Sequence, residues 1–249
     1  MTRKTVIVTG ASTGIGAAAA RLAAKAGYDV AIGYRSDHKG ASDTAKAVEA
    51  AGGRAQLIQA DLSDPHEIDR FFAEFDAAFD HLDALVNNAG VVDLATRVDQ
   101  LDHARLRRMF DTNTLGPMLV AGHAVRRMST AHGGKGGAIV NISSAAARLG
   151  SANLYVDYAA SKAAIDIFTK GLSDEVAAEG IRVNGIRPGL IETPIHAKGG
   201  QPDRAQKLAG MVPMKRTGTA QEVAEAIVWL MSDKASYVTG TTLDVTGGR

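Results

Sequence analysis

The sequence predicts an α/β fold: a single domain in which helices cover both faces of a doubly wound parallel sheet of seven strands. Short apolar, often β-branched runs alternate with longer amphipathic runs along the chain, which is typical of successive strand–helix units. No change of composition and no linker rich in Pro or Ser divides the 249 residues. This length suits one large domain with a sizeable core, so we expect residues 1–249 to form a single domain.

The expected strands are the short apolar runs, from KTVIVTG near the N-terminus to TTLDVTGG near the C-terminus. Because they alternate with helices, we expect them to pair in parallel. In chain order they cover residues 4–10, 29–34, 54–62, 82–90, 137–143, 180–189 and 241–248.

The longer runs are expected as helices. The first is rich in Ala and closes at Gly27. The third begins with Asp64 in the N-cap position, Pro65 at the first helical position and Glu67 at the third. One stripe of this helix is apolar, which indicates a face buried in the core: Ile68, Phe71, Phe72, Phe75 and Phe79. The expected helices cover residues 14–27, 41–53, 64–79, 101–128 and 155–178.

The composition excludes several classes of function. The formal net charge is +1, so the chain offers no basic field for nucleic acid. It has no Cys, which excludes disulfides and thiolate catalysis, and its seven His show no close pair with metal-ligand spacing. The N-terminal stretch MTRKTVIVTG lacks the apolar region of a signal peptide, and no apolar run approaches the ~18 residues of a membrane span. We expect a cytoplasmic protein with no metal, no nucleic-acid partner and no membrane partner.

A glycine cluster directly follows the first expected strand. VTGASTGIG places Gly10, Gly14 and Gly16 between that strand and the first helix, with the spacing G-x-x-x-G-x-G. Gly10 would allow a tight turn, Gly14 would let backbone approach a pyrophosphate, and Gly16 would let helix and strand pack closely. The helix N-terminus would then present N–H groups to the phosphates. The pattern predicts a dinucleotide site in a Rossmann-type domain; a glycine-rich turn with no ligand is the alternative.

The end of the second expected strand bears on which dinucleotide binds. NAD-binding folds usually place Asp or Glu there to hold the ribose hydroxyls. This chain has Tyr34 at that point and Arg35 next, while Asp37 lies beyond the turn. A planar guanidinium suits a 2′-phosphate, because it donates charge-assisted hydrogen bonds to phosphate oxygens. We therefore predict that NADP(H) is preferred over NAD(H); a solvated loop arginine is the alternative.

The stretch YVDYAASKAA contains two tyrosines, a serine and a lysine. In a helix, Tyr158 and Lys162 share one face, because side chains at i and i+4 stack one turn apart. An ammonium beside a phenol favours the phenolate and lowers a pKa that starts near ~10. Tyr158 would then be an acid/base usable near neutral pH, whereas Tyr155 has Ala159 four residues on. An ordinary Tyr and Lys on a half-exposed helix are the alternative.

The glycine pattern, NNAG at residues 87–90 and Y-x-x-x-K at residues 158–162 occur together and in this order. With them the chain resembles the short-chain dehydrogenase/reductase family, from about residue 4 to the C-terminus. It looks most like reductases of the β-ketoacyl-carrier-protein type and glucose-dehydrogenase-like enzymes. The resemblance implies that Tyr158 transfers the proton and that Ser144, rather than Ser143, donates a hydrogen bond to the substrate oxygen. It also implies that Lys162 bridges to the nicotinamide ribose.

The resemblance implies a fourth catalytic residue, Asn113, in the long helix expected at residues 101–128. Pro117 has no N–H, so the carbonyl of Asn113 would lose its helical partner. We expect this carbonyl to hold a water that links Lys162 to solvent. A helix kink with no catalytic role is the alternative.

The motifs and the resemblance together imply the remaining cofactor contacts. Asp61 resembles the acid that contacts adenine in the family, and Asn87 would support the sheet. Ile191, through its backbone, and Thr193 would hold the nicotinamide carboxamide. The full expected set of cofactor-binding residues is Gly10, Ser12, Thr13, Gly14, Ile15, Gly16, Tyr34, Arg35, Ser36, Asp61, Leu62, Asn88, Ala89, Gly90, Tyr158, Lys162, Pro188, Gly189, Ile191 and Thr193.

These features predict an NADP(H)-dependent oxidoreductase that interconverts a small-molecule ketone and a secondary alcohol. β-Ketoacyl-carrier-protein reduction and sugar oxidation of the glucose 1-dehydrogenase type remain alternatives. A non-enzymatic nucleotide-sensing scaffold would be expected to have lost Tyr158, Lys162 or Ser144, and all are present.

Two further expectations concern the lid and the assembly. Residues 191–214 mix glycines, prolines and both polarities, and are expected to form a mobile substrate lid. The family resemblance implies a homotetramer, with Ala163, Ile167 and Phe168 on the helix at residues 155–178 as candidate contacts.

Overall fold

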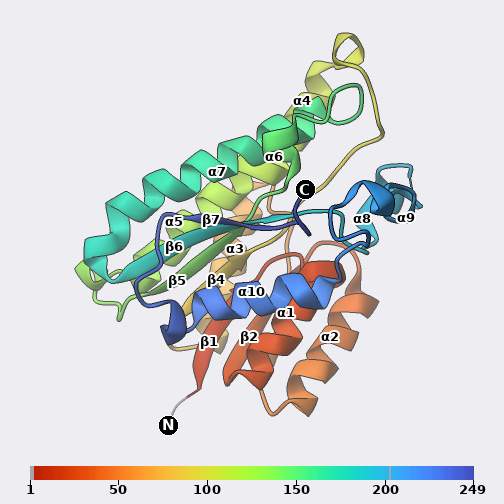
Figure 1. Cartoon of the computed structure of the whole chain (residues 1–249). Coiled ribbons are helices and arrows are strands. Elements are labelled where there is room, and N and C mark those ends of the chain that lie inside the picture. The colour runs from red at the N-terminus through yellow and green to blue at the C-terminus, as the bar shows by residue number, and fades with distance from the viewer. Residues whose placement is uncertain (1–2, 202) are drawn as a thin grey trace.

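Seven strands form one parallel sheet in the order β3-β2-β1-β4-β5-β6-β7, which confirms the predicted fold class (Figure 1). The computed structural model describes residues 3–201 and 203–249. Each expected strand is present; β2 begins one residue earlier than expected, and the other strands are shorter than the apolar runs that predicted them. The strands are β1 (Lys4–Val8), β2 (Tyr28–Tyr34), β3 (Ala55–Gln59), β4 (Ala84–Asn87), β5 (Gly137–Ile142), β6 (Ile181–Pro188) and β7 (Thr242–Val245).

Strand β1 lies at the point where the strand order reverses. Val6 is in register with Val30 of β2 on one side and with Ala84 of β4 on the other. The chain therefore winds outward from β1 in both directions, and the carboxyl ends of β1 and β4 part to leave a crevice. In folds of this kind ligands bind in that crevice.

Helices cover the two faces of the sheet, as the alternating pattern predicts (Figure 1). Helices α1, α2 and α10 pack on one face through residues such as Ala20, Val48 and Ile227. Helices α3, α5 and α7 pack on the other. The longer helices are α1 (Gly14–Lys25), α2 (His38–Ala50), α3 (Pro65–Ala78), α4 (His103–Phe110), α5 (Gly116–Met128), α7 (Val156–Val176) and α10 (Ala220–Met231); the shorter ones are α6 (Ala146–Leu149), α8 (Ile195–Lys198) and α9 (Arg204–Leu208).

Helix α3 begins as its sequence predicts. The Asp64 side chain accepts a hydrogen bond from the His66 N–H at 2.9 Å, and Pro65 is the first helical residue. All residues of its predicted apolar stripe are buried: Ile68, Phe71, Phe72, Phe75 and Phe79. This stripe is therefore core, as predicted.

The long helix expected at residues 101–128 is present as one unbroken helical run from His103 to Met128, but it is not α-helical throughout. The structure has α4, then a wider π turn at Asp111–Leu115, then α5. The Gly116 N–H bonds to the Asp111 carbonyl, five residues back, and Pro117 has no N–H to continue the usual ladder. Pro117 is visible in the sequence, but the sequence does not show that the turn before it is widened by one residue.

Helix α10 was not anticipated from the sequence, although its start carries a recognisable signal. Thr219 and Glu222 form a capping box, in which each side chain bonds to the backbone N–H of the other residue. Within residues 3–201 and 203–249, no helix combines the length and the apolar character needed to cross a membrane.

Gly16→Ala should lower the melting temperature, because the added Cβ would lie 2.5 Å from both the Gly10 carbonyl oxygen and Asn88 Nδ2. Such overpacking typically costs ~1–3 kcal/mol. The control is Gly122→Ala in α5, whose Cβ would meet only the end of the Arg126 side chain, at 3.8 Å. Thermal unfolding of both variants should show a loss for Gly16→Ala alone. Equal melting temperatures would contradict the close packing.

Candidate active site

A cavity of about 600 Å³ opens at the carboxyl ends of the strands, where the strand order reverses. The cofactor-binding residues expected from the sequence all line it except Gly16, which lies beneath the loop. Of the expected catalytic residues, Ser144, Tyr158 and Lys162 line it. Asn113 is fully buried and does not. The sequence therefore identified about half of the residues that line one cavity.

The glycine loop has the geometry that its pattern predicts. Gly10 and Gly14 have φ values of +64° and +57°, which side chains other than Gly rarely adopt. A Cβ on Gly10 would lie 3.0 Å from Ala89 Cα, so the loop also sits close to the end of β4. Thr13 precedes α1 with extended backbone, and its side chain does not cap the helix. The first N–H groups of α1 therefore meet the cavity without a side-chain cap from Thr13.

Two residues that were not assigned these roles from the sequence join the ends of β1 and β4. The Thr9 hydroxyl oxygen accepts hydrogen bonds from the N–H groups of Asn88 and Ala89, both at 2.9 Å. The Asn88 side chain donates to the carbonyls of Thr9 and Gly10, at 2.8 and 3.2 Å. Asn87, predicted to support the sheet, donates to the Pro117 carbonyl and to Asn141. The signal available in the sequence was the position of Thr9, a hydroxyl residue between an apolar strand and the first glycine of the loop.

Arg35 lies at one end of the cavity, half exposed, with Nη1 3.8 Å from Asp61 Oδ2. Burial acts to raise the pKa of Asp61, but hydrogen bonds from Ser63 and the charge of Arg35 outweigh it and lower the pKa overall. The Tyr34 hydroxyl shares a hydrogen bond of 2.9 Å with His38 Nδ1. Asp37 is taken up as the N-cap of α2, accepting from the Gly40 N–H. Arg35 thus supplies a cation at this end of the cavity, and its contact with Asp61 is a long ion pair.

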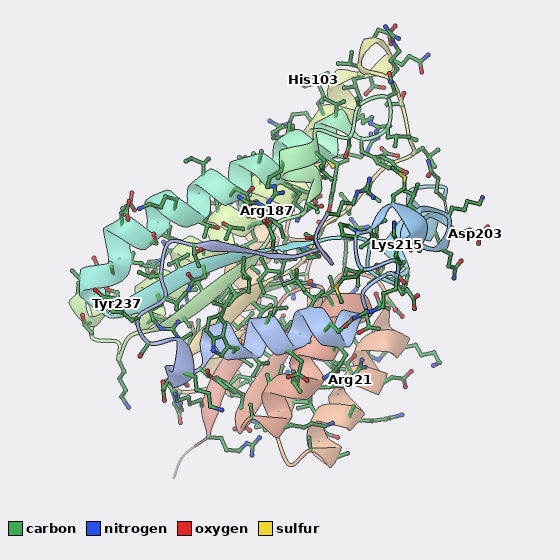
Figure 2. The ribbon with its side chains drawn as sticks, viewed as in Figure 1. Arg21, His103, Arg187, Asp203, Lys215 and Tyr237 are labelled. Carbon is green, nitrogen blue, oxygen red and sulfur yellow. The ribbon has the colours of Figure 1, made fainter. Side chains whose placement is uncertain are left out.

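Lys162 is buried on α7, one turn beyond Tyr158. Its Nζ donates to the Ile142 carbonyl at 2.8 Å and lies 5.9 Å from the centre of the Tyr158 ring. Burial lowers the pKa of Lys162 to about 8, against an opposing contribution from the carboxylate of Asp166. Asp166 also binds Arg187 at 2.8 Å, between α7 and the end of β6 (Figure 2). The Ile142 carbonyl therefore holds the ammonium near the Tyr158 ring, while burial favours loss of its charge.

The serines at the end of β5 have different surroundings. The Ser143 hydroxyl is buried and donates to the Lys162 carbonyl at 3.0 Å, so it supports α7. The Ser144 oxygen accepts from the Ala146 N–H at 3.1 Å, and this contact leaves its O–H as a donor. Ser144 lines the cavity with its O–H as a donor, so its surroundings suit the role that the resemblance implies, and that role stays a prediction.

Asn113 sits in the π turn and holds the segment after β4. Its Oδ1 accepts from the Val91 N–H at 2.7 Å, and its Nδ2 donates to the Val91 carbonyl at 2.9 Å. A Cβ on Gly90 would lie 3.2 Å from Asn113 Oδ1 and 3.3 Å from Lys162 Nζ. The side chain thus anchors backbone next to Lys162, while its expected water-holding carbonyl remains a prediction.

Most other residues that line the cavity are apolar, and apart from Ile195 in the expected lid the sequence did not single them out for this site. They come from the segment after β4, from the α6–α7 region and from the start of the expected lid: Val91, Val92, Leu149, Ala152, Leu154, Tyr155, Leu190 and Ile195. Arg249 lines it as well. In the described part of the chain, no group of three or more His, Cys, Asp and Glu side chains could hold a metal ion.

Comparisons with known proteins agree with this geometry. Residues 10–249 match the family model described as enoyl-(acyl carrier protein) reductase. An uncharacterized oxidoreductase of Escherichia coli K12, YgfF, is 51% identical over 243 residues, which cover 98% of each chain. A protein of Eggerthella lenta named 3beta-hydroxysteroid dehydrogenase 1 is 41% identical over 251 residues, covering 98% of this chain and 93% of its own length.

A solved structure is similar over the same length. It is a short-chain dehydrogenase from Burkholderia cenocepacia in complex with NADP, with a TM-score of 0.90 and 32% identity. The match covers 98% of this chain and 97% of that chain. By its fold, its family match and its relatives over almost its whole length, the protein belongs to the short-chain dehydrogenase/reductase family.

Proposed function

We propose that the protein is an NADP(H)-dependent oxidoreductase that interconverts a ketone and a secondary alcohol, with Tyr158 as the proton donor or acceptor. The observation that carries this proposal is the buried Lys162 ammonium, held 5.9 Å from the Tyr158 ring at the wall of the cavity. Ser144 lines the same cavity with its O–H as a donor. The three groups together supply a proton, a hydrogen bond to oxygen and a positive charge.

The glycine loop fits a dinucleotide. Side chains at Gly10 and Gly14 would require rare backbone conformations, and a Cβ on Gly14 would fill the space 3.3 Å from Thr193. Backbone N–H groups at the start of α1 suit a pyrophosphate. Arg35, at the far end, suits the 2′-phosphate of NADP. A nicotinamide bound in the rest of the cavity would supply or accept the hydride.

In the reductive direction, the Tyr158 hydroxyl gives its proton to the carbonyl oxygen, which gains negative charge as the carbon is reduced. The Ser144 hydroxyl donates a hydrogen bond to the same oxygen and stabilises that charge. The Lys162 ammonium stabilises the phenolate left on Tyr158. A proton then returns to Tyr158 through Lys162 and the backbone near Asn113. In the oxidative direction the same groups act in reverse.

The walls of the cavity favour an apolar ketone over a polyhydroxylated sugar, because its additional lining residues are mostly apolar. The relative named for a 3β-hydroxysteroid supports a cyclic, apolar substrate class. An acidic carrier protein would need a basic rim, but two arginines that could contribute to one are paired with carboxylates. Arg127 binds Asp76, and Arg148 binds Asp244. Carrier-protein reduction and sugar oxidation therefore rank below reduction of a small apolar ketone.

A cytoplasmic homotetramer with residues 191–214 as a lid completes the proposal; residue 202 lies outside the described part. Exposed apolar side chains on several elements support assembly. They are Leu115, Leu119, Ile167, Trp229, Leu243 and Tyr237, the last of which is labelled in Figure 2. Phe168, an expected contact, packs against the core instead. Ile195 and Gly199 line the cavity, and this position supports the proposal that residues 191–214 form a lid over it.

Tyr158→Phe should abolish ketone reduction while NADPH affinity stays nearly unchanged, because only the transferable proton is removed. A panel of cyclic and linear ketones, followed by NADPH absorbance, gives the rates, and fluorescence titration gives the affinity. Tyr155→Phe removes a hydroxyl that binds the Gly199 carbonyl and should cost far less. Comparable losses in the two variants would contradict the assignment of Tyr158.

Asp166→Asn should move the alkaline loss of reductive activity to lower pH. Reduction needs protonated Lys162, whose pKa is about 8, and the Asp166 carboxylate raises that pKa. Removing the carboxylate therefore lowers the pKa of Lys162, so its charge is lost sooner as pH rises. The control is Asp174→Asn, an exposed position on the same helix that pairs with Lys170. The pH dependence of kcat should shift for Asp166→Asn alone, and a shift to higher pH would contradict the role of Lys162.

Arg35→Ala should weaken NADPH binding and leave NADH binding almost unchanged. A charge-assisted contact to phosphate contributes about 1.5–3 kcal/mol, and each ~1.4 kcal/mol is tenfold in affinity. Arg35 is half exposed and lies near Asp61, so a loss of about tenfold is expected. Tyr34→Asp combined with Arg35→Ala should invert the preference. Equal effects on both dinucleotides in titrations of the single variant would overturn the NADP assignment.

A further inference from the structure

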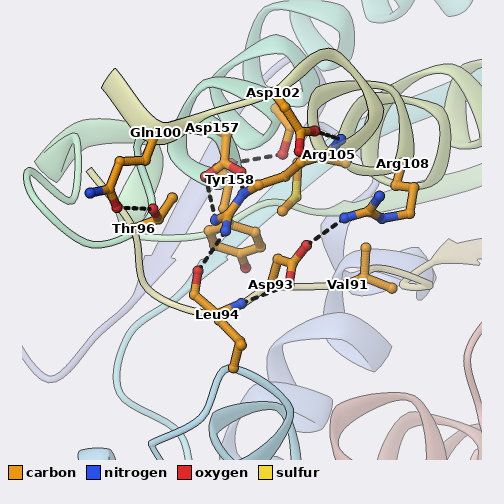
Figure 3. A network of polar contacts seen from close by, with 12 residues as sticks. Val91, Asp93, Leu94, Thr96, Gln100, Asp102, Arg105, Arg108, Asp157 and Tyr158 are labelled. Atoms are coloured by element: carbon orange, nitrogen blue, oxygen red, sulfur yellow. Dashed lines mark hydrogen bonds and ion pairs between the residues drawn. The ribbon is translucent and has the colours of Figure 1, made fainter. Parts of the chain in front are cut away.

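A buried ion pair lies directly beside the proposed proton donor (Figure 3). Arg105 Nε of α4 donates to Asp157 Oδ2 of α7 at 2.7 Å, and Nη2 approaches Oδ1 at 3.4 Å. The two side chains are only 11% and 1% exposed. Asp157 precedes Tyr158 in the first turn of α7. Burying two charges is costly and breaking such a pair more so, hence this contact fixes α4 against the start of the catalytic helix.

Arg105 also holds the segment that runs from β4 to α4. Its Nη1 donates to the Leu94 carbonyl at 2.8 Å (Figure 3). Three residues earlier, both backbone groups of Val91 are bound by Asn113. Val91 and Val92 line the cavity. This wall of the cavity is therefore held at one end by Asn113 and at the other by Arg105.

The held segment touches the proposed lid. A Cβ on Gly200 would lie 2.8 Å from Leu94 Cδ2, so the Leu94 side chain rests against the backbone of Gly200. On the other side, the Tyr155 hydroxyl donates to the Gly199 carbonyl at 3.2 Å. Residues 199–200 are thus gripped between Leu94 and Tyr155. Both contacts connect residues 199–200 to the start of α7. Leu94 does so through Arg105, and Tyr155 does so directly.

We propose that Arg105 is a positioning residue: through Asp157 and the Leu94 carbonyl it clamps the cavity wall and residues 199–200 against the start of α7. The clamp keeps the substrate carbonyl in line with Tyr158 without touching it. This inference rests on the proposed function, because it concerns the substrate end of the same cavity. The cavity wall, residues 199–200 and the start of α7 are all held by one buried ion pair. The Arg105 guanidinium therefore sets the distance between the substrate and Tyr158.

The chain provides a matched control on the same helix and segment. Arg108 of α4 donates to Asp93 at 3.0 Å, one residue before Leu94. Its side chain is 64% exposed and that of Asp93 36%. An exposed pair of this kind contributes little. Arg108→Gln therefore removes an arginine contact to the same segment without removing the clamp.

The main test is the double variant Arg105→Leu with Asp157→Leu. It removes the pair and the Leu94 contact but leaves no unpaired buried charge, so it should fold even if Arg105→Gln does not. We expect kcat/KM for a cyclic ketone to fall roughly ten- to a hundredfold, because a misplacement of about 1 Å can cost this much. The dissociation constant of NADPH should stay within about twofold of the parent value, as should all parameters of Arg108→Gln. If the double variant folds and keeps the parent kcat/KM, the Arg105–Asp157 pair has only a structural role and the proposal is overturned.

Hydrogen exchange separates failure of the clamp from failure of the proposed function. Peptides covering residues 91–97 and 195–201 should exchange faster in the double variant than in Arg108→Gln. This readout needs no turnover, so it still tests the clamp if the parent enzyme reduces none of the ketones. Equal exchange in the two variants would overturn the proposal. Faster exchange confined to the double variant would support it.

Discussion

The proposed active site depends on one buried ammonium group. Lys162 is 4% exposed, and a charge at such a depth is tolerated only where hydrogen bonds surround it. The carbonyl of Ile142 accepts from it, Ser143 binds the Lys162 carbonyl, and Gly90 leaves space between Nζ and Asn113. These neighbours come from the end of β5, from the segment after β4 and from the π turn. The demand of a single cation therefore explains why strand ends, π turn and helix meet at this point.

The sheet makes that meeting possible. Parallel strands bring all their carboxyl ends to one edge, and reversal of strand order at β1 opens a crevice there. Thr9 and Asn88 then join the two sides of the crevice by their hydrogen bonds, which fixes the glycine loop against β4. In the proposed function, this rigid edge of the sheet holds the cofactor. The substrate end is built from loops and from the clamp around Arg105, so specificity can change there without disturbing the sheet.

Features that depend on local pattern were predictable from the sequence. Strand–helix alternation indicated the fold, and strand-end positions together with the family resemblance indicated about half of the cavity wall, from Gly10 to Thr193. The π turn was not predictable, because Pro117 shows where a ladder breaks but not how the backbone closes around the break. The pairing of Arg105 with Asp157 was also missed, since these residues lie 52 positions apart and meet only because α4 packs on α7. Their charges looked like those of ordinary solvated helix residues.

The most direct measurement of the central claim is a crystal structure of the protein with NADP⁺ and an unreactive ketone analogue. The account predicts the ketone oxygen within hydrogen-bond distance, about 2.6–3.2 Å, of both the Tyr158 and Ser144 hydroxyls. It also predicts Lys162 Nζ still bound to the Ile142 carbonyl beside the nicotinamide ribose. A ketone oxygen bound away from Tyr158, or Lys162 turned out of its buried position, would contradict the account.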